Sequence, residues 1–275
     1  MDSPTRPYIQ GSVKQAKEEM SELILETRGL SKDFKGFTAV DGVDLQVQRG
    51  HIHALIGPNG AGKTTCFNLL TKFLEPTRGS ILFDGLDITR ERPAQIARRG
   101  VIRSFQISAV FPDLTVLENV RIGLQRFTGT SYRFWTGLTG LGKLDARVLE
   151  LLELVDLRDV ANVRAGDLPY GRKRALEIAT TMAMEPRLML LDEPTQGMGH
   201  EDVERVTSLI KRVAEGRTVL MVEHNMKVVS RIADRITVLA RGAVLAEGDY
   251  AAVSAHPAVL EAYMGSEAAT LEGAH

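Results

Sequence analysis

Disulfides, long apolar runs and a strong net charge are all missing from this sequence of 275 residues. It contains one cysteine, Cys66, so no intrachain disulfide can form, which is typical of proteins in a reducing compartment. No stretch approaches the roughly 20 consecutive apolar residues that cross a bilayer. Residues 1–20 also lack the apolar core of a secretory signal. The sequence therefore predicts a cytoplasmic protein.

Acidic and basic residues almost balance, with 35 Asp and Glu against 34 Lys and Arg and a formal net charge of −1. A near-neutral chain has no overall electrostatic attraction to nucleic acid or acidic lipid, so we expect no nucleic-acid partner. Hydrophobic residues make up 44% of the chain, which is enough for a buried core and argues against a disordered protein.

Strand and helix patterns alternate over much of the chain after residue 22. Short apolar runs bounded by Gly or charged residues predict the strands ELILETR, DLQVQ, HIHALIG, SILFDG, VIRSF, RLMLLDEP, TVLMVEH and RITVLA. Helices are expected from Lys63 to about Phe73, from Glu201 to Ala214 and onward from Asn225. This alternation implies a parallel sheet with right-handed crossovers. The predicted fold class is α/β.

The middle third of the chain has a helical character. Apolar residues recur there at helical spacing, at Val148, Leu151, Leu152, Val155, Ala175, Ile178, Ala179, Met182 and Ala183. TVLENV also predicts a helix, whereas the Gly/Thr-rich segment FTGTSYRFWTGLTGLGKL is expected to be a loop or insertion. We therefore predict a helical subdomain at about 107–184 inserted in a domain that spans 22–265. A polar extension, 1–21, and a tail, 266–275, complete the predicted organisation.

A glycine-rich loop between a predicted strand and a predicted helix matches the pattern G-x-x-x-x-G-K-[ST]. The loop and the threonine after it are Gly57, Pro58, Asn59, Gly60, Ala61, Gly62, Lys63, Thr64 and Thr65. Glycines let successive N–H groups point inward at a phosphate, and the following helix adds the positive end of its dipole. We expect Lys63 to reach the β- and γ-phosphates and the Thr64 hydroxyl to coordinate Mg²⁺. The apolar strand expected before the loop and the helix expected after it favour a phosphate-binding loop over a glycine-rich turn without a ligand.

The strand RLMLLDEP ends in two carboxylates about 130 residues after this loop. At the carboxyl edge of a parallel sheet, Asp192 can hold Mg²⁺ through water, and Glu193 can orient or deprotonate an attacking water. Alone, such a pair is weak evidence, because acidic residues often cap the next helix. Together with the phosphate-binding loop, the pair indicates hydrolysis of a nucleoside triphosphate.

Three further sequence features lie at defined positions relative to the predicted strands. Gln106 follows the strand VIRSF, LPYGRKRALEIA precedes RLMLLDEP, and His224 ends TVLMVEH. Singly, a Gln or a His at a strand end is more often structural. In this order, from about Leu23 to Gly265, the chain resembles the ATP-binding subunits of ABC transporters. The resemblance implies ATP and Mg²⁺ as cofactors. It also implies a P-loop NTPase core with an antiparallel β subdomain and an inserted helical subdomain.

The resemblance assigns roles to individual positions. Phe34, in SKDFKG, corresponds to the aromatic residue that stacks on adenine, with a core phenylalanine as the alternative. Gln106 corresponds to the glutamine that contacts Mg²⁺ or the attacking water, and His224 to the histidine that contacts the γ-phosphate. The expected catalytic set is Glu193, His224, Lys63 and Gln106. The expected metal ligands are Thr64, Gln106 and Asp192.

The chain departs from the family at the signature, which usually reads Leu-Ser-Gly-Gly-Gln and covers the ATP of an opposing subunit. The corresponding residues are Leu168, Pro169, Tyr170, Gly171 and Arg172. Pro169 replaces the serine that would bond the γ-phosphate, and proline has no N–H. Arg172 is either solvated or restores charge near the phosphates, and Gly199 stands where the family usually has Asp. We therefore predict a heterodimer with a second ABC ATPase, in which one site is competent and the other impaired.

Tyr170 and the segments VEHNMKVV and HPAVLEAYMG resemble the importers of branched-chain amino acids and related small amides. That resemblance implies two membrane permease subunits, a periplasmic or extracellular substrate-binding protein, and a peripheral position on the cytoplasmic face of the inner membrane. A lipopolysaccharide-export ATPase and a non-hydrolysing regulatory subunit remain alternatives. A soluble ABC ATPase of DNA repair or translation is a third, although the chain has neither a second ATPase unit nor a long coiled-coil insertion.

Overall fold

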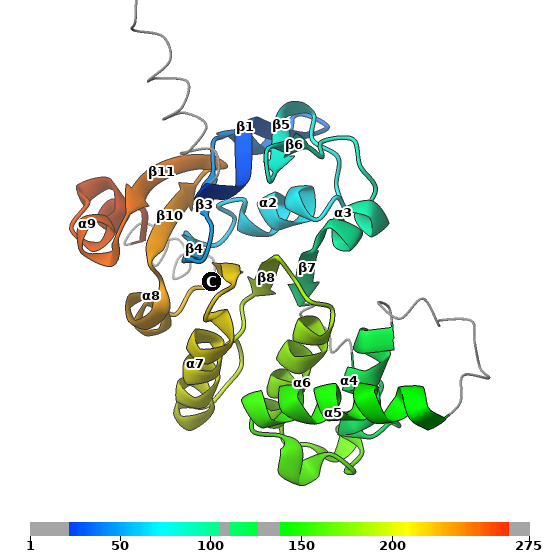
Figure 1. Ribbon diagram of the computed structural model, residues 1–275. Helices are drawn as coiled ribbons and strands as arrows, with labels where there is room; N and C mark the ends of the chain where they lie inside the picture. Colours follow the sequence, from blue (N-terminus) through cyan, green and yellow to red (C-terminus); the bar gives the residue numbers. More distant parts are fainter. Residues whose placement is uncertain (1–21, 105–109, 126–137, 264–275) are drawn as a thin grey trace, which may run out of the picture.

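The structure is a computed structural model that describes residues 22–104, 110–125 and 138–263, with the backbone alone for 138–143. In Figure 1, β1, β5 and β6 lie in the upper part, helices α4, α5 and α6 in the lower right, and the strands of a second sheet between them. No helix among these residues is both long and apolar enough to span a bilayer.

The larger sheet has the strand order β11-β10-β4-β9-β8-β7. Its strands are β4 (Ile52–Ile56), β7 (Val101–Ser104), β8 (Leu188–Asp192), β9 (Thr218–Val222), β10 (Arg235–Ala240) and β11 (Ala243–Gly248). All neighbours in this sheet pair in parallel except β10 and β11. The parallel sheet predicted from strand–helix alternation is therefore confirmed.

Each central strand supplies side chains to two hydrophobic layers, because successive residues of a strand face opposite sides of the sheet. In β8, Met189 and Leu191 join the layer that contains α6 and α7, and Leu188 and Leu190 join the layer that contains α2. Strand β9 divides in the same way, and all five residues of each strand are buried. Burial on both faces explains why these segments are continuous apolar runs.

An antiparallel sheet covers the layer around α2. Its strands are β1 (Leu23–Phe34), β2 (Phe37–Val43), β3 (Gln46–Gln48), β5 (Arg78–Phe83) and β6 (Leu86–Asp87). The path runs β2-β1-β5-β6, and β3 also pairs with β1. Helix α2 (Lys63–Leu70) packs its buried Phe67, Leu69 and Leu70 into the same hydrophobic layer as Ile81 and Phe83 of β5.

The other helices of the core surround the larger sheet. They are α3 (Pro93–Arg99), α7 (His200–Ala214), α8 (Met226–Ile232) and α9 (Tyr250–Ser254), followed by a helical segment at 257–263. Helix α7 begins one residue before its predicted start and carries acidic residues in its first turn and basic residues in its last, which suits the helix dipole. The predicted helix after Asn225 is confirmed, with the Asn225 side chain as its N-cap.

Between β7 and β8 the described elements are all helical. They are α4 (Val116–Gln125), α5 (Leu138–Leu154), the 3₁₀ turns Arg158–Val160 and Ala165–Asp167, and α6 (Tyr170–Ala183). Helices α4, α5 and α6 contact one another, and the apolar faces predicted on α5 and α6 are buried. The predicted helix TVLENV begins at Val116.

The prediction of a loop in the Gly/Thr-rich segment is wrong for its last part, because residues 138–144 are the first turns of α5. Gly140 and Gly142 each cost about 1 kcal/mol relative to alanine in a helix. The buried face from Val148 to Val155 already anchors this helix, so extending it requires no new nucleation. Residues 127–137 of the segment lie outside the described residues.

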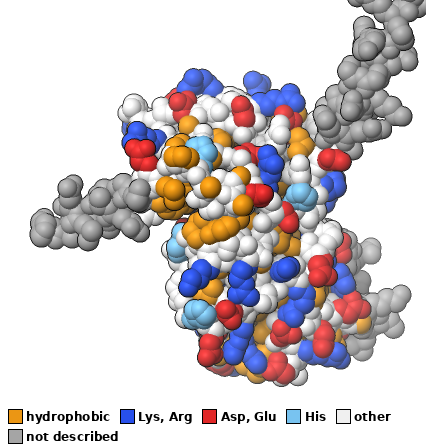
Figure 2. All heavy atoms as spheres, turned by 90° about the vertical axis from the view of Figure 1, so that its left-hand side faces the viewer, with side chains coloured by type: hydrophobic (Ala, Val, Ile, Leu, Met, Phe, Trp, Pro, Cys, Tyr) orange, Lys and Arg blue, Asp and Glu red, His pale blue; other side chains and the backbone are white. Residues whose placement is uncertain are grey.

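The described part of the face drawn in Figure 2 carries a mixed surface. Lysine and arginine side chains are interspersed with aspartate and glutamate, and apolar side chains gather near the middle. Interspersed charges of both signs produce no strong field of one sign over this face.

The burial of α5 predicts a large cost for shortening Leu152, whose side chain is inaccessible to solvent. Leu152→Ala should lower the free energy of unfolding by about 2–5 kcal/mol, because the substitution removes buried methyl groups and leaves a cavity. Urea denaturation of the full chain measures this change. Leu260→Ala, at a leucine that is 50% exposed, is the matched control and should cost much less. Equal losses in the two variants would contradict the burial of this face.

Candidate functional site

The glycine-rich loop between β4 and α2 depends on backbone positions that reject a side chain. Gly57, Gly60 and Gly62 all have positive φ values, of 150°, 77° and 99°. A Cβ on Gly57 would lie 2.1 Å from the Leu239 carbonyl oxygen of β10, and one on Gly62 would lie 2.5 Å from the Ala39 carbonyl oxygen of β2. The loop therefore packs directly on the backbone of both sheets.

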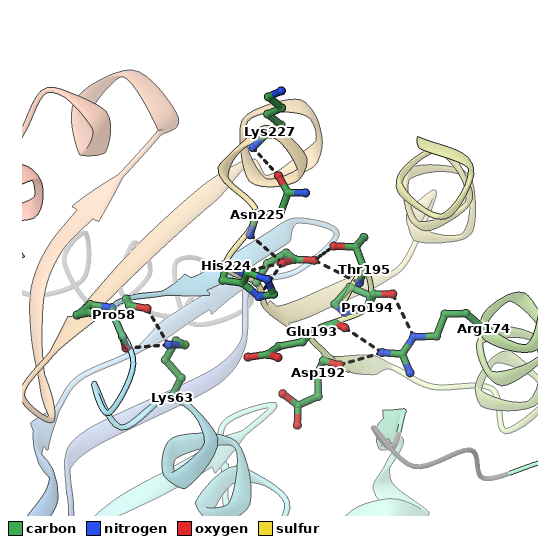
Figure 3. A network of polar contacts seen from close by, with 12 residues as sticks. Pro58, Lys63, Arg174, Asp192, Glu193, Pro194, Thr195, His224, Asn225 and Lys227 are labelled. Atoms are coloured by element: carbon green, nitrogen blue, oxygen red, sulfur yellow. Dashed lines mark hydrogen bonds and ion pairs between the residues drawn. The ribbon is translucent and has the colours of Figure 1, made fainter. Parts of the chain in front are cut away.

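Lys63, the first residue of α2, extends its side chain back over this loop (Figure 3). Its Nζ donates hydrogen bonds to the carbonyl oxygens of Gly57, at 2.7 Å, and Pro58, at 2.9 Å. Burial lowers the pKa of Lys63 from its ordinary value of 10.5, and the negative charge of Glu193 opposes that shift. The loop therefore presents a partly desolvated cation next to a helix N-terminus, which is an environment suited to phosphate.

Asp192 emerges at the carboxyl end of β8, where the sequence predicted it. Its side chain is buried and forms an ion pair with Arg103 of β7. The same guanidinium donates to Oδ1 of Asn68 on α2, at 2.6 Å, and lies 5.7 Å from the centre of the Phe67 ring. Arg103 therefore links the strand that carries Asp192 to the helix that follows the phosphate-binding loop.

Glu193 occupies a strained turn directly after β8. Its φ is 43°, in the left-handed region that non-glycine residues rarely adopt. Its N–H donates to the Val222 carbonyl of β9 at 2.9 Å, while Arg174 of α6 bonds its carbonyl oxygen from the other side. In Figure 3 the Glu193 side chain extends toward the side of Lys63.

His224 follows β9 and is held through its neighbour Glu223. The Glu223 carboxylate is completely buried and accepts the backbone N–H groups of His224, at 2.7 Å, and Asn225, at 2.9 Å. Its other oxygen accepts the Thr195 hydroxyl, from the loop after Glu193 (Figure 3). One carboxylate thus joins the loops that carry Glu193 and His224. The His224 imidazole itself is exposed, with Nδ1 3.6 Å from Glu223.

Phe34 lies at the end of β1, where it pairs with Phe37 across the turn to β2. Its side chain is exposed, and the Lys32 ammonium lies 5.2 Å from the ring centre. The alternative of a core phenylalanine is therefore excluded. Because β2 packs on Gly62, this turn belongs to the same side of the molecule as the phosphate-binding loop.

The predicted signature forms the start of α6. Leu168 is buried, Pro169 is the N-cap, and the Tyr170 hydroxyl donates to the Gln196 carbonyl at 3.2 Å. A Cβ on Gly171 would lie 2.7 Å from a carboxylate oxygen of Asp202, and Arg172 pairs with Asp159 at 3.0 Å. Among the described residues, no hydrogen bond or ion pair of this segment reaches the phosphate-binding loop.

Gln106 lies outside the described residues, so the Mg²⁺ ligands can be compared with the structure only at Thr64 and Asp192. A hydroxyl and a carboxylate are the oxygen donors that Mg²⁺ prefers. The described residues contain no cluster of three or more His, Cys, Asp or Glu side chains that could hold a metal. This donor set fits an ion that takes its remaining ligands from phosphate oxygens and water.

Four residues at the site were not predicted from the sequence, namely Arg103, Arg174, Glu223 and Tyr263. Each of the first three is a charged residue within or beside an apolar run, which is the one signal that could have identified it. Tyr263 lies in the helical segment 257–263, and its hydroxyl meets the Gly57 backbone in a buried position. Burial raises the pKa of Tyr263 to about 12.

Comparison with known proteins finds two family matches. The family described as "ABC transporter" matches residues 40–196, and the one described as "Branched-chain amino acid ATP-binding cassette transporter" matches residues 243–269. The first match covers the phosphate-binding loop, the α4–α6 helices, and Asp192 with Glu193. The second covers β11 and the C-terminal helical segment that carries Tyr263.

Individual relatives are similar over nearly their whole length. The chain is 41% identical over 258 residues to the high-affinity branched-chain amino acid transport ATP-binding protein BraF of Pseudomonas aeruginosa, covering 90% of this chain and 99% of BraF. It is 38% identical to the corresponding protein LivG of Escherichia coli, with the same coverage. The ADP conformation of MJ1267, an ATP-binding cassette of an ABC transporter, superposes with a TM-score of 0.78 at 30% identity, over 88% of this chain and 99% of MJ1267.

The position of Lys63 predicts its contribution to ATP affinity. Lys63→Met should weaken ATP binding roughly ten- to a hundredfold, because a charge-assisted hydrogen bond contributes about 1.5–3 kcal/mol. Titration with a fluorescent ATP analogue measures this effect. The matched control is Lys211→Met, at an exposed lysine in the last turn of α7, which should bind as the unaltered protein does. Unchanged affinity in a folded Lys63→Met variant would contradict the assignment.

Proposed function

Because the chain belongs to the ABC transporter family of ATP-binding subunits, we propose that it hydrolyses ATP to power uptake of branched-chain amino acids or related small amides. The observation that carries this proposal is its similarity to BraF and LivG over 90% of its length, together with the branched-chain match at residues 243–269. Those relatives favour an importer over the lipopolysaccharide-export alternative. The ordered arrangement of Lys63, Asp192 and Glu193 favours hydrolysis over a purely regulatory role.

In the proposed reaction the phosphate-binding loop holds the β- and γ-phosphates through its N–H groups and Lys63, which exchanges the carbonyls of Gly57 and Pro58 for phosphate oxygens. The Glu193 carboxylate orients a water and accepts its proton as the water attacks the γ-phosphate in line. The bond between the γ-phosphorus and the oxygen that bridges it to the β-phosphate breaks, so that ADP leaves with this electron pair and inorganic phosphate is formed. His224, on its Glu223-bound loop, contacts the γ-phosphate, and the exposed ring of Phe34 stacks on adenine.

Mg²⁺ would be held by Thr64, Asp192 and Gln106, and when bound it supplies positive charge that stabilises the phosphate oxygens. The pairing of Asp192 with Arg103 supports this role for the aspartate, because the ion pair orients the buried carboxylate at the end of β8. The chain then contributes an aligned carboxylate and hydroxyl, and the nucleotide contributes the phosphate oxygens.

The partner proposed for this chain is a second ABC ATPase whose ATP is covered by Leu168–Arg172. Pro169 offers neither a hydroxyl nor an N–H to that nucleotide, and Arg172 is already paired with Asp159. The site that this chain completes for its partner is therefore the impaired one. The competent site uses the phosphate-binding loop and Glu193 of this chain with the signature of the partner.

The further partners proposed are two membrane permease subunits and a periplasmic or extracellular substrate-binding protein, with this chain on the cytoplasmic face of the inner membrane. The helices α4 to α6, with the segment around Gln106, would receive the permease. Phe111, Ile122 and Val163 are exposed apolar side chains of this region that such a contact would cover.

Purification of the tagged chain from its native membrane in mild detergent tests the assembly. We expect two multi-span permeases and a second ATPase in stoichiometric amounts. After reconstitution into vesicles with the binding protein, ATP should drive uptake of labelled leucine but not of labelled ribose. Recovery as a soluble monomer, or with ribosomes or DNA enzymes, would overturn the transport function.

The asymmetry of the two sites predicts unequal effects of removing their carboxylates. Glu193→Gln should reduce ATP turnover of the assembled complex by at least about a hundredfold, the scale of general-base catalysis. The equivalent substitution in the partner should leave most of the turnover intact. Turnover is measured by phosphate release, with ATP binding as the control for folding. If the substitution in the partner caused the larger loss of turnover, the competent site would be the one built on the phosphate-binding loop of the partner, and the proposed assignment would be wrong.

A further inference from the structure

The guanidinium of Arg174 binds three consecutive backbone carbonyls around the strained turn at Glu193. Its Nη2 donates to the carbonyl oxygens of Asp192, at 2.9 Å, and Glu193, at 3.3 Å, and its Nε donates to that of Pro194, at 3.2 Å. Figure 3 shows the guanidinium reaching this turn from α6, on the side away from Lys63. Arg174 is 7% exposed, so these bonds are shielded from water.

The turn that Arg174 binds is a conformation that the backbone would not adopt by itself. A non-glycine residue in the left-handed region is unfavourable by about 1–2 kcal/mol, so surrounding contacts must maintain Glu193 at its φ of 43°. On one side the contact is the hydrogen bond from the Glu193 N–H to Val222 of β9. On the other side it is Arg174. The direction of the Glu193 side chain follows from this backbone conformation.

Arg174 is itself fixed by a buried partner on the next turn of α6. Its Nη1 donates to Oε2 of Glu177 at 2.5 Å, and each side chain of this i, i+3 pair is 7% exposed. A charged group is retained in the interior when it is paired and its remaining hydrogen-bonding groups are satisfied. Glu177 compensates the positive charge of Arg174. The carbonyl oxygens of residues 192–194 accept hydrogen bonds from Nη2 and Nε of the same guanidinium.

We propose that Arg174 is a positioning residue that sets the direction of the Glu193 carboxylate and couples it to the first turn of α6. That turn begins at the signature segment, and Tyr170 binds the same β8–α7 loop at Gln196. A displacement of the signature helix against the nucleotide of the partner is thereby transmitted to the carboxylate that acts on this chain's own nucleotide. The inference rests on the proposed function, in which Glu193 orients and deprotonates the attacking water.

The test replaces the whole buried pair, so that neither charge is left alone in the interior. Arg174→Met/Glu177→Met should retain a melting temperature close to that of the unaltered protein, because apolar side chains of similar volume replace a buried ion pair with little loss of stability. The single variant Arg174→Met should melt lower, since it leaves Glu177 unpaired. Both are made in the full chain, purified with its copurifying subunits.

We expect the double variant to bind a fluorescent ATP analogue in EDTA within threefold of the unaltered affinity. Its kcat for ATP should fall ten- to a hundredfold, the scale expected when a reacting group is displaced by about 1 Å. A change in kcat without a change in affinity separates positioning from a structural role. The matched control is Arg231→Met/Glu204→Met, which removes an exposed ion pair of 3.2 Å between α8 and α7 and should leave kcat and affinity unchanged.

Two outcomes would overturn the inference. A kcat within threefold of the unaltered value in a stable double variant would show that Glu193 is positioned without Arg174. A parallel loss of melting temperature, affinity and kcat would show that the pair only supports the fold. Failure of the proposed function is recognised separately, because Glu193→Gln would then leave turnover intact in a protein whose Arg174 is present.

Discussion

The central strands β4, β8 and β9 are buried along their whole length, and their side chains enter a hydrophobic layer on each face of the sheet. A charged side chain in the middle of such a strand would lose its hydration on either face. Charged side chains therefore appear only where these three strands end. The phosphate-binding loop follows β4, Asp192 and Glu193 end or follow β8, and Glu223 and His224 follow β9. Double-sided burial thus concentrates the chemistry at one edge of the sheet.

At that edge, protein groups neutralise or hold several of the side chains proposed to act on the nucleotide. Lys63 binds two carbonyls of its own loop, Asp192 pairs with Arg103, and the His224 loop is bound by Glu223. Nucleotide binding is then an exchange of partners for Lys63, and the net free energy is much smaller than the gross strength of the new bonds. The same arrangement keeps the side chains oriented before the nucleotide arrives, which reduces the entropy lost on binding.

The sequence was sufficient to predict the parallel sheet, the helices that follow β4 and β9, and the positions of Lys63 and Asp192, because each depends on a local pattern. A glycine-rich turn before a helix and an apolar run before a carboxylate are both contiguous in the chain. The left-handed backbone of Glu193 was not predictable in this way, because Arg174 and Val222, which hold it, are 19 and 29 residues distant. Arg103 meets Asp192 only because β7 pairs with β8. The helical start of α5 was not predicted, because Gly140 and Gly142 are typical of a loop. The buried face that stabilises this helix lies further along the chain, after residue 147.

The single cysteine has a consequence for spectroscopy. Cys66 faces the core from α2 with no exposed surface, and burial raises the pKa of its thiol to about 12. Since the thiolate is the reactive species, this residue is inert to thiol reagents at neutral pH while the protein is folded. No cysteine therefore has to be removed from this chain before a label is attached at a chosen position. A cysteine introduced on an exposed face of α6 or α7 would be the one position on this chain to take up a spin label or fluorophore, and distances between such labels could follow the relative motion of two subunits through an ATP cycle.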